Sequence, residues 1–290
     1  MGKRNWTPFF AIIPSMVLVL GIAIYPIGYA IYLSLTNRMM QNPRVSFIGL
    51  ENYLRNLADA KFWQFVWTTA IFVIGSVGIE LLLGFGLALL LNQNIRGRTL
   101  FRIIMLIPLM IPPVTAALMW KVMLDATTGP VNYLIHLVTG LTGPTWLASD
   151  VLALPTITAI DVWIFTPFVA LILLAGLQSI PETMYEAAAV DGAGTWKTFR
   201  MVTLPMLRPM IYLVLLFRLA LALTSADTIF ATTEGGPHIA TTTLNYAAFQ
   251  QLFNYGFMGY AASLGITVFI IIYVTTQLLI GNTRHMWKGA

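Results

Sequence analysis

The amino-acid sequence predicts an all-α integral membrane protein with six transmembrane helices. The composition and the length of the apolar runs support this prediction. Of the 290 residues, 58% are hydrophobic and only 9% are charged, whereas soluble globular domains have about 25% charged residues. So few charges could not cover the surface of a soluble fold of this size. The chain is therefore expected in a lipid bilayer.

Six apolar runs are long enough to cross a bilayer, which takes about 20 residues per helix. They cover approximately residues 9–35, 65–91, 103–120, 152–177, 210–231 and 261–281. None alternates in polarity as the strands of a membrane barrel do. The first run is too long for a signal-peptide core and has no small-residue cleavage site. We expect a retained first helix and one transmembrane domain over residues 1–290.

The distribution of lysine and arginine predicts the orientation. Placing both termini in the cytoplasm puts 10 of the 16 basic residues inside, as the positive-inside rule favours. Lys3, Arg4, Arg284 and Lys288 belong to this group, whereas the first external loop opposes the rule with four basic residues. The prediction is a multi-pass protein of the cell (inner or plasma) membrane with cytoplasmic termini.

Prolines interrupt three of the predicted spans, and each removes a backbone donor and bends or breaks a helix. Such breaks are tolerated in lipid where neighbouring helices or a watery cavity satisfy the freed carbonyls. Two readings remain open, simple kinking of the helices and a hinged central pathway. The prolines concerned are Pro14, Pro26, Pro108, Pro112, Pro113 and Pro167.

Residues 178–209 are too polar to span and have clear helix start and stop signals. Ser179 and Glu182 have the spacing of a capping box, and Gly192 supplies a helix stop. A second short helix is expected over residues 195–202. The segment therefore predicts a helix–turn–helix at the membrane surface. Its second helix has only two basic residues, so nucleic acid is not expected as a partner.

The same segment contains Glu186-Ala187-Ala188, Gly192 four positions later, Val202 and Leu204-Pro205. This pattern resembles the EAA loop of binding-protein-dependent ABC importer permeases, with Val202 where the family has Ile. The likeness continues in Phe47 to Tyr53, which resembles the family's FxGLxNY motif, and in Gly235-Gly236-Pro237. Together these motifs resemble the sugar-importer branch, in the maltose- or trehalose-type first permease subunit.

The resemblance implies an ABC importer permease (MetI-like) bundle in which residues 178–209 couple to a cytoplasmic ATPase. The implied partners are a second permease subunit, an ATPase dimer, an extracytoplasmic solute-binding protein and a sugar. The alternative is a surface helix that folds back on its own bundle. The implied coupling residues are Glu186, Ala187, Ala188, Asp191, Gly192, Leu204 and Pro205.

Several kinds of chemistry have no signature in the sequence. No GxxxxGK[ST] phosphate loop occurs, so ATP and its magnesium are expected on a partner subunit. The chain has no cysteine, its three histidines lack metal-ligand spacing, and no nucleophile–base constellation is evident. We expect no enzyme activity, no catalytic residue, no metal and no cofactor of its own.

Three ionisable residues lie inside predicted spans, where such groups usually mark function or pairing. We expect Glu80 and Arg218 to form a structural charge pair, which leaves Asp161 free to face the transport pathway. In the resembling family, sugar contacts come from the spans on either side of the EAA loop. The implied pathway residues are Asp161, Ile164, Phe165, Phe168, Arg218 and Ser225.

The predicted function is the transmembrane subunit of an ATP-driven importer for a carbohydrate, a di- or oligosaccharide. One alternative is an ion-coupled secondary transporter that uses Glu80, Asp161 and Arg218 as a relay. Another is an ABC permease for a non-sugar solute such as a glycerol phosphate. The uncharged segment 241–260 fits either a docking surface for the solute-binding protein or an aromatic belt at the membrane interface.

Overall fold

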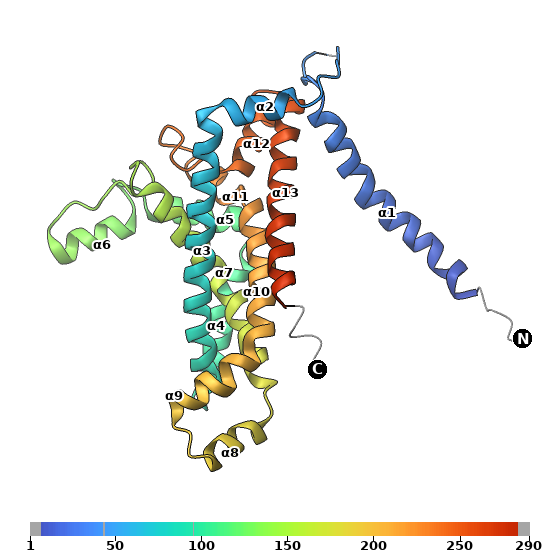
Figure 1. Cartoon of the computed structure of the whole chain (residues 1–290). Helices are drawn as coiled ribbons and strands as arrows, with labels where there is room; N and C mark the ends of the chain where they lie inside the picture. Colours follow the sequence, from blue (N-terminus) through green and yellow to red (C-terminus); the bar gives the residue numbers. More distant parts are fainter. Residues whose placement is uncertain (1–6, 43, 95, 284–290) are drawn as a thin grey trace, which may run out of the picture. The chain divides into compact units, whose positions relative to one another are not determined.

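The computed structural model describes residues 7–42, 44–94 and 96–283, and Figure 1 traces the chain. Lys3, Arg4, Arg284 and Lys288 lie outside these ranges, so the orientation inferred from them stays a prediction. Within the described ranges the regular structure is helical, apart from one isolated bridge between Thr36 and Phe47. The predicted all-α fold is confirmed.

The helices are, in chain order, α1 (Thr7–Ser34), α2 (Glu51–Ala58), α3 (Ala60–Asn92), α4 (Arg98–Met110), α5 (Pro113–Met123), α6 (Pro130–Thr139), α7 (Ala153–Gln178), α8 (Glu182–Val190), α9 (Thr195–Thr198), α10 (Leu204–Thr224), α11 (Asp227–Thr232), α12 (Leu244–Phe253) and α13 (Met258–Thr283). A π-helical turn, Phe199–Thr203, joins α9 to α10. Five helical segments of the described chain are long and apolar enough to cross a membrane, and the bent pair α4–α5 would make a sixth. This count agrees with the six predicted spans.

The third predicted span, residues 103–120, is not a single helix. α4 ends at Met110 and α5 begins at Pro113, and the two helices meet at 95°. Pro112 and Pro113 cause the break, because a residue before proline disfavours the helical region and proline has no N–H to donate. Ile111 is accordingly extended, with φ −87° and ψ 128°. Pro108 and Pro167, in contrast, lie inside helices.

The fifth predicted span, residues 210–231, begins too late and ends too late. The membrane-crossing segment of the structure is Thr195–Thr224, and Ser225 is already extended. Pro205 lies in the first turn of α10, where its missing N–H costs nothing. α10 therefore starts at Leu204, within residues 178–209, which the sequence predicted to lie outside the membrane.

By its internal contacts the chain divides into two compact units, residues 1–63 with 247–269 and residues 64–246 with 270–290. In the first unit, the amide of Asn52 donates to the carbonyls of Ser34 and Thr36, at 2.8 and 3.0 Å. Asn56 donates to the hydroxyl of Ser263 at 3.1 Å. These buried amides connect the end of α1 to α2 and α2 to α13. The single domain expected from the sequence stays a prediction.

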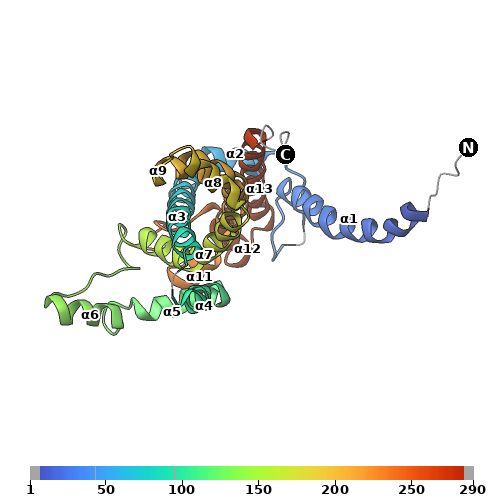
Figure 2. The same ribbon diagram turned by 90° about the horizontal axis from the view of Figure 1, so that it is seen from below.

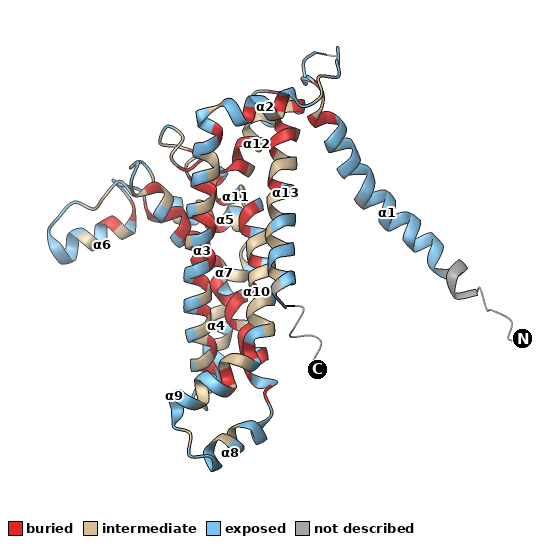
Figure 3. Cartoon of the chain, in the orientation of Figure 1, coloured by how far each residue is buried: buried red, intermediate tan, exposed pale blue. Residues whose placement is uncertain are grey.

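The second unit is organised around α3, α7 and α10. Near the loop that follows α7, their buried side chains and Ile180 of that loop form one apolar cluster: Ala88, Leu91, Val169, Leu173, Leu174, Leu177, Ile180, Leu207 and Val214. Figure 3 shows buried residues along α7, whereas α8 is mostly exposed. At Gly84 of α3, an added Cβ would lie 2.6 Å from Cγ1 of Val169 and 3.1 Å from the backbone nitrogen of Ala170. Gly84 and Ala88 thus allow α3 to approach α7 closely, as small residues four apart do in membrane bundles.

A buried ionic triad joins the same three helices. Glu80 of α3, Asp161 of α7 and Arg218 of α10 are all fully buried. The guanidinium donates to both carboxylate oxygens of Glu80, from Nε to Oε2 and from Nη2 to Oε1. Its Nη2 also donates to Oδ2 of Asp161, at 2.7 Å. The expectation that Asp161 stays free of Arg218 is therefore wrong, because the planar guanidinium has enough donors to reach two acids at once.

We predict that Gly84→Ala destabilises the protein, because the added methyl group overpacks the contact with Val169. Overpacking of a packed core typically costs about 1–3 kcal/mol. The control is Gly86→Ala in the same helix, where an added Cβ meets nothing within 4 Å. Thermal unfolding in detergent should show a lower Tm for Gly84→Ala and an unchanged Tm for Gly86→Ala. Equal Tm values would contradict the close α3–α7 contact.

We also predict that Arg218→Met lowers the yield of folded protein, because it leaves two acids buried without their cation. Removing one partner of a buried ion pair costs about 3–5 kcal/mol. Adding Glu80→Gln and Asp161→Asn should recover part of the yield, since no charge is then left unpaired. Arg208→Met, at an exposed position of α10, is the control. A triple variant no better than Arg218→Met, judged by size-exclusion chromatography, would show that unpaired charge is not the cause.

Candidate functional site

The segment between α7 and α10 forms two short helices at one end of the second unit. α8 covers Glu182–Val190, and α9 begins at Thr195. The views in Figures 1 and 2 place α8 and α9 beyond the same end of α3 and α7. The first helix and the turn expected within residues 178–209 are present, but the second helix does not end at residue 202, because it continues through the π-helical turn into α10. We call this segment the coupling loop.

The turn between the two helices depends on Gly192. Its φ is +67°, a left-handed conformation that glycine adopts without strain. The carbonyls at the end of α8 are satisfied inside the turn, since Ala193 donates to Ala188 and Gly192 to Ala189. Gly192 therefore ends α8 and directs the chain into α9.

The predicted capping box at the start of α8 is wrong. The hydroxyl of Ser179 donates to the carbonyl of Gly176, at 2.7 Å, and so completes the last turn of α7. The residue before α8 is Pro181, and no side chain caps the helix. The spacing of Ser179 and Glu182 was right for a capping box, but Ser179 still has the helical backbone of α7.

The coupling loop is held at one edge and exposed at the other. Tyr185 approaches Thr203 with 3.4 Å between their hydroxyls, whereas Glu186, Ala187 and Asp191 are exposed. No residue of α8 is buried, and Val190 and Trp196 are 87% and 73% exposed. This exposure argues against a helix folded back on its own bundle. The loop presents acidic, small and apolar side chains together, which suits a protein partner.

An aromatic row connects the exposed end of the coupling loop to α3. Trp196 stacks on Phe199 with 5.5 Å between ring centroids, and Phe199 meets Phe85 at 5.8 Å. Beside this row lies a cleft of about 870 Å³ with Asn92, Gln93 and Tyr185 in its lining. A displacement of the loop would therefore reach α3 through packed rings, and α7 and α10 through the continuous backbone.

The six predicted pathway residues do not form one open site. Asp161, Ile164 and Arg218 are fully buried within the second unit, and the two charged groups bond to each other. Phe165 is half-buried, and the centroid of its ring lies 4.0 Å from Cζ of the Arg218 guanidinium. Phe168 and Ser225 are half-buried as well. The charged residues therefore lie behind the accessible surface of α7 and α10.

Sequence reasoning missed Phe217, which lies next to Arg218 but points away from the triad. It is 52% exposed and meets Phe168 edge to face, with 6.4 Å between centroids. Leu221, one turn later, is 44% exposed. Phe168, Phe217 and Leu221 thus form an apolar strip across α7 and α10. The helical spacing of Phe217 and Leu221 was the signal that could have identified it.

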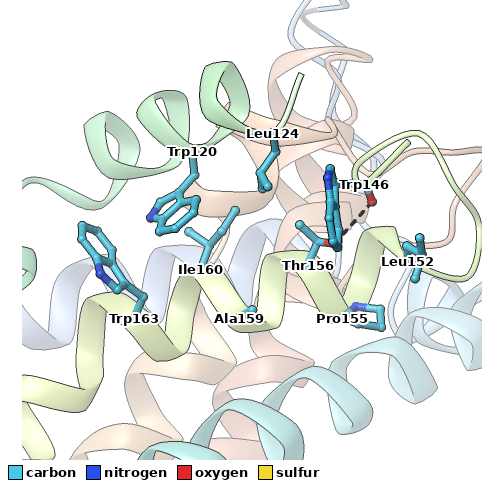
Figure 4. Close-up of a pocket in the computed structure, with 9 residues that line it drawn as sticks. All are labelled: Trp120, Leu124, Trp146, Leu152, Pro155, Thr156, Ala159, Ile160 and Trp163. Atoms are coloured by element: carbon cyan, nitrogen blue, oxygen red, sulfur yellow. Dashed lines mark hydrogen bonds between the residues drawn. The ribbon is translucent and has the colours of Figure 1, made fainter. Parts of the chain in front are cut away.

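A second feature that the sequence did not reveal is a tryptophan-lined cleft of about 320 Å³, shown in Figure 4. Trp120 of α5 meets Trp163 of α7 edge to face at 5.5 Å. Trp146, from the segment before α7, donates its indole N–H to Asn132 at 2.7 Å. The lining contains no charged residue. The cleft can accept an apolar surface or ring but offers no group for acid–base chemistry.

A turn after α5 contains a cluster of polar groups. One carboxylate oxygen of Asp125 accepts hydrogen bonds from the backbone N–H groups and the hydroxyls of Thr127 and Thr128, at 2.8–3.0 Å. These bonds stabilise the carboxylate and lower the pKa of Asp125. Asp125 therefore stabilises the turn that follows α5 by accepting these hydrogen bonds. In the described ranges, no group of three or more His, Asp or Glu side chains could hold a metal.

Comparison with known proteins identifies relatives over nearly the whole chain. The trehalose/maltose transport system permease protein MalF of Thermococcus litoralis is 36% identical over 279 residues, which cover 96% of this chain and 94% of that protein. The trehalose transport system permease protein SugA of Mycobacterium tuberculosis is 34% identical over 274 residues, 94% of this chain and 85% of the relative.

A solved structure shares the fold. The alginate ABC transporter, crystallised in complex with an alginate pentasaccharide-bound periplasmic protein, contains a chain that superposes with a TM-score of 0.84 at 21% identity. The match covers 98% of this chain and 96% of the other. The family model described as "binding-protein-dependent transport system inner membrane component" matches residues 80–282, which include the triad, the tryptophan cleft and the coupling loop. The chain belongs to this family of multi-pass inner membrane permease components.

Proposed function

We propose that the chain is one of two permease subunits of an ATP-driven importer that carries a di- or oligosaccharide into the cytoplasm. The exposed coupling loop is the observation that supports this proposal most strongly. A permease that works alone has no use for a protein-docking loop with no buried residue in α8. The names of the relatives, which are permeases for trehalose and maltose, support a carbohydrate cargo.

In this proposal the coupling loop docks on a cytoplasmic ATPase dimer. Glu186 and Asp191 supply charge, Ala187 and Ala188 allow close approach, and Gly192 keeps the turn tight. Leu204 and Pro205 begin α10 and connect the loop to the pathway helix. ATP and magnesium bind to the ATPase, and this chain performs no chemistry. Both termini are then cytoplasmic, and an extracytoplasmic solute-binding protein delivers the sugar at the opposite face.

The cargo passes along the accessible faces of α7 and α10. Sugar rings stack their C–H faces on aromatic side chains, and Phe168 and Phe217 present such a surface. Ser225 is placed to meet a hydroxyl group, since it is half-buried just after the end of α10. Asp161, Ile164 and Arg218 support this surface from behind. The second permease subunit supplies the polar groups that this strip lacks.

An ion-coupled secondary transporter is the weaker alternative. Its relay would need Glu80, Asp161 and Arg218 to face a water-filled path, but all three are fully buried in this arrangement of the helices, and Arg218 bonds both acids. It would also leave the coupling loop without a role. An importer for a non-sugar solute remains a distinct outcome of the experiment below.

We predict that the reconstituted complex hydrolyses ATP faster with a disaccharide-loaded binding protein than with the empty protein. Glu186→Lys should abolish most of this stimulation, because a reversed charge opposite a specific partner can cost several kcal/mol. Folding and membrane insertion should persist, because Glu186 is exposed. Asn94→Lys, which adds a positive charge at an exposed position after α3 and outside the coupling loop, is the control and should behave as wild type.

Two results would separate the parts of this proposal. Stimulation by a binding protein loaded with a glycerol phosphate, and not with a sugar, would reject the carbohydrate cargo and keep the importer. Full stimulation of the Glu186→Lys variant would reject the assignment of the coupling loop.

A further inference from the structure

The ionic triad contains one more acid than base. Glu80, Asp161 and Arg218 are each 0% exposed. The sequence has eleven acidic residues, all within the described ranges, and Glu80 and Asp161 are the two that are buried. With all three groups ionised, a net charge of −1 would be enclosed between apolar helices, which is unfavourable because burial removes the solvation that water gives to a charge.

No described charge on the neighbouring helices is placed to compensate. The helices that pack on α7 carry half-buried Arg98 and Arg102 on α4, and exposed Lys121 and Asp227 on α5 and α11. Arg102 bonds to the carbonyl of Leu91, eleven residues along α3 from Glu80, or about 16 Å at the helical rise. Arg208, ten residues from Arg218 on α10, is about 15 Å away and exposed. α13 has no charged residue within its bounds.

The two acids are bonded differently. Both oxygens of Glu80 accept hydrogen bonds from Arg218, which is the bidentate geometry of a carboxylate. Asp161 uses only Oδ2, and its Oδ1 is buried with no hydrogen-bond partner. A buried oxygen without a donor is disfavoured in a carboxylate but is available to carry a proton.

A buried hydroxyl lies on the same helix as Glu80. Ser76 is one turn before Glu80 on α3 and is fully buried. Its hydroxyl donates to the carbonyl of Val73, at 3.5 Å. The lone pairs of the Ser76 oxygen therefore remain open to an O–H donor.

We propose that the triad binds one proton, held on Oδ1 of Asp161, so that the closed bundle is electrically neutral. Glu80 is the carboxylate, Arg218 is the cation, and Asp161 is a carboxylic acid that accepts from Arg218 through Oδ2. The proton is retained only while the three helices exclude water. If α7 and α10 separate and water reaches Asp161, the acid ionises at neutral pH and releases the proton. Proton binding thus favours the closed arrangement of the helices that flank the coupling loop.

Infrared spectroscopy of the purified full-length protein tests this directly. Exposed acids are ionised at neutral pH. An infrared band of a protonated carboxyl group at neutral pH therefore comes from a buried acid. We expect such a band, and we expect it to shift when the aspartates carry ¹³C carboxyl groups but not when the glutamates do. The absence of any such band would overturn the proposal, because both acids would then be ionised. A band that shifts with labelled glutamate would overturn the assignment to Asp161.

A second measurement follows the linkage between proton binding and stability. Because the folded state holds a proton that the unfolded aspartate releases, the Tm of the wild type should fall as the pH rises through the neutral range. The Tm of Asp161→Asn, which cannot lose a proton, should lack this component, and an equal fall in both proteins would contradict the proposal. The labelling experiment uses no variant, so it decides the question even if Asp161→Asn does not fold.

Discussion

The second unit depends on one constraint, that the charge of a guanidinium buried between apolar helices must be balanced by acids. Arg218 bonds Glu80 and Asp161 at the same time, through Nε and Nη2. Because the guanidinium is planar and its donors have fixed directions, the two acids must approach from defined positions. The triad therefore sets α3, α7 and α10 relative to one another. Gly84 and the apolar cluster below the triad then pack where this arrangement brings the helices together.

The same helices connect the triad to the coupling loop. α7 enters the loop and α10 leaves it without a break, through the π-helical turn Phe199–Thr203. The aromatic row from Trp196 through Phe199 to Phe85 adds α3 to this path. A force on the loop is thus transmitted to all three helices that the triad joins. This geometry is what an importer needs in order to couple ATPase closure to the arrangement of its pathway helices.

The features predicted from the sequence are those that depend on local composition. Long apolar runs predict membrane helices because a backbone in lipid must satisfy its own hydrogen bonds. A glycine after a helix predicts a turn because glycine adopts the left-handed conformation without strain, and Gly192 has that conformation in the structure. The bend at Pro112 and Pro113 was suggested by the prolines, but the prolines alone do not specify its angle of 95°. The start of α10 was misjudged because Pro205 and Pro209 do not interrupt the helix, which runs from Leu204 to Thr224.

The features that could not be predicted depend on contacts between distant residues. Trp120, Trp146 and Trp163 lie in three separate segments, and only the fold brings their rings around one cleft. Glu80, Asp161 and Arg218 were each recognised as unusual, but depth in the membrane alone allowed several pairings. The number of acids that Arg218 can reach is decided by three-dimensional geometry.

Site-directed cross-linking of the coupling loop tests the central claim most directly, because the chain contains no cysteine. A single cysteine at the exposed position of Ala187 should form a cross-link to the ATPase subunit in the assembled complex. A single cysteine at Val151, which is 77% exposed before α7, should form none. Cross-linking of the ATPase through Ala187→Cys and not through Val151→Cys is the result that the account predicts. An assembled complex in which Ala187→Cys never reaches the ATPase would contradict it.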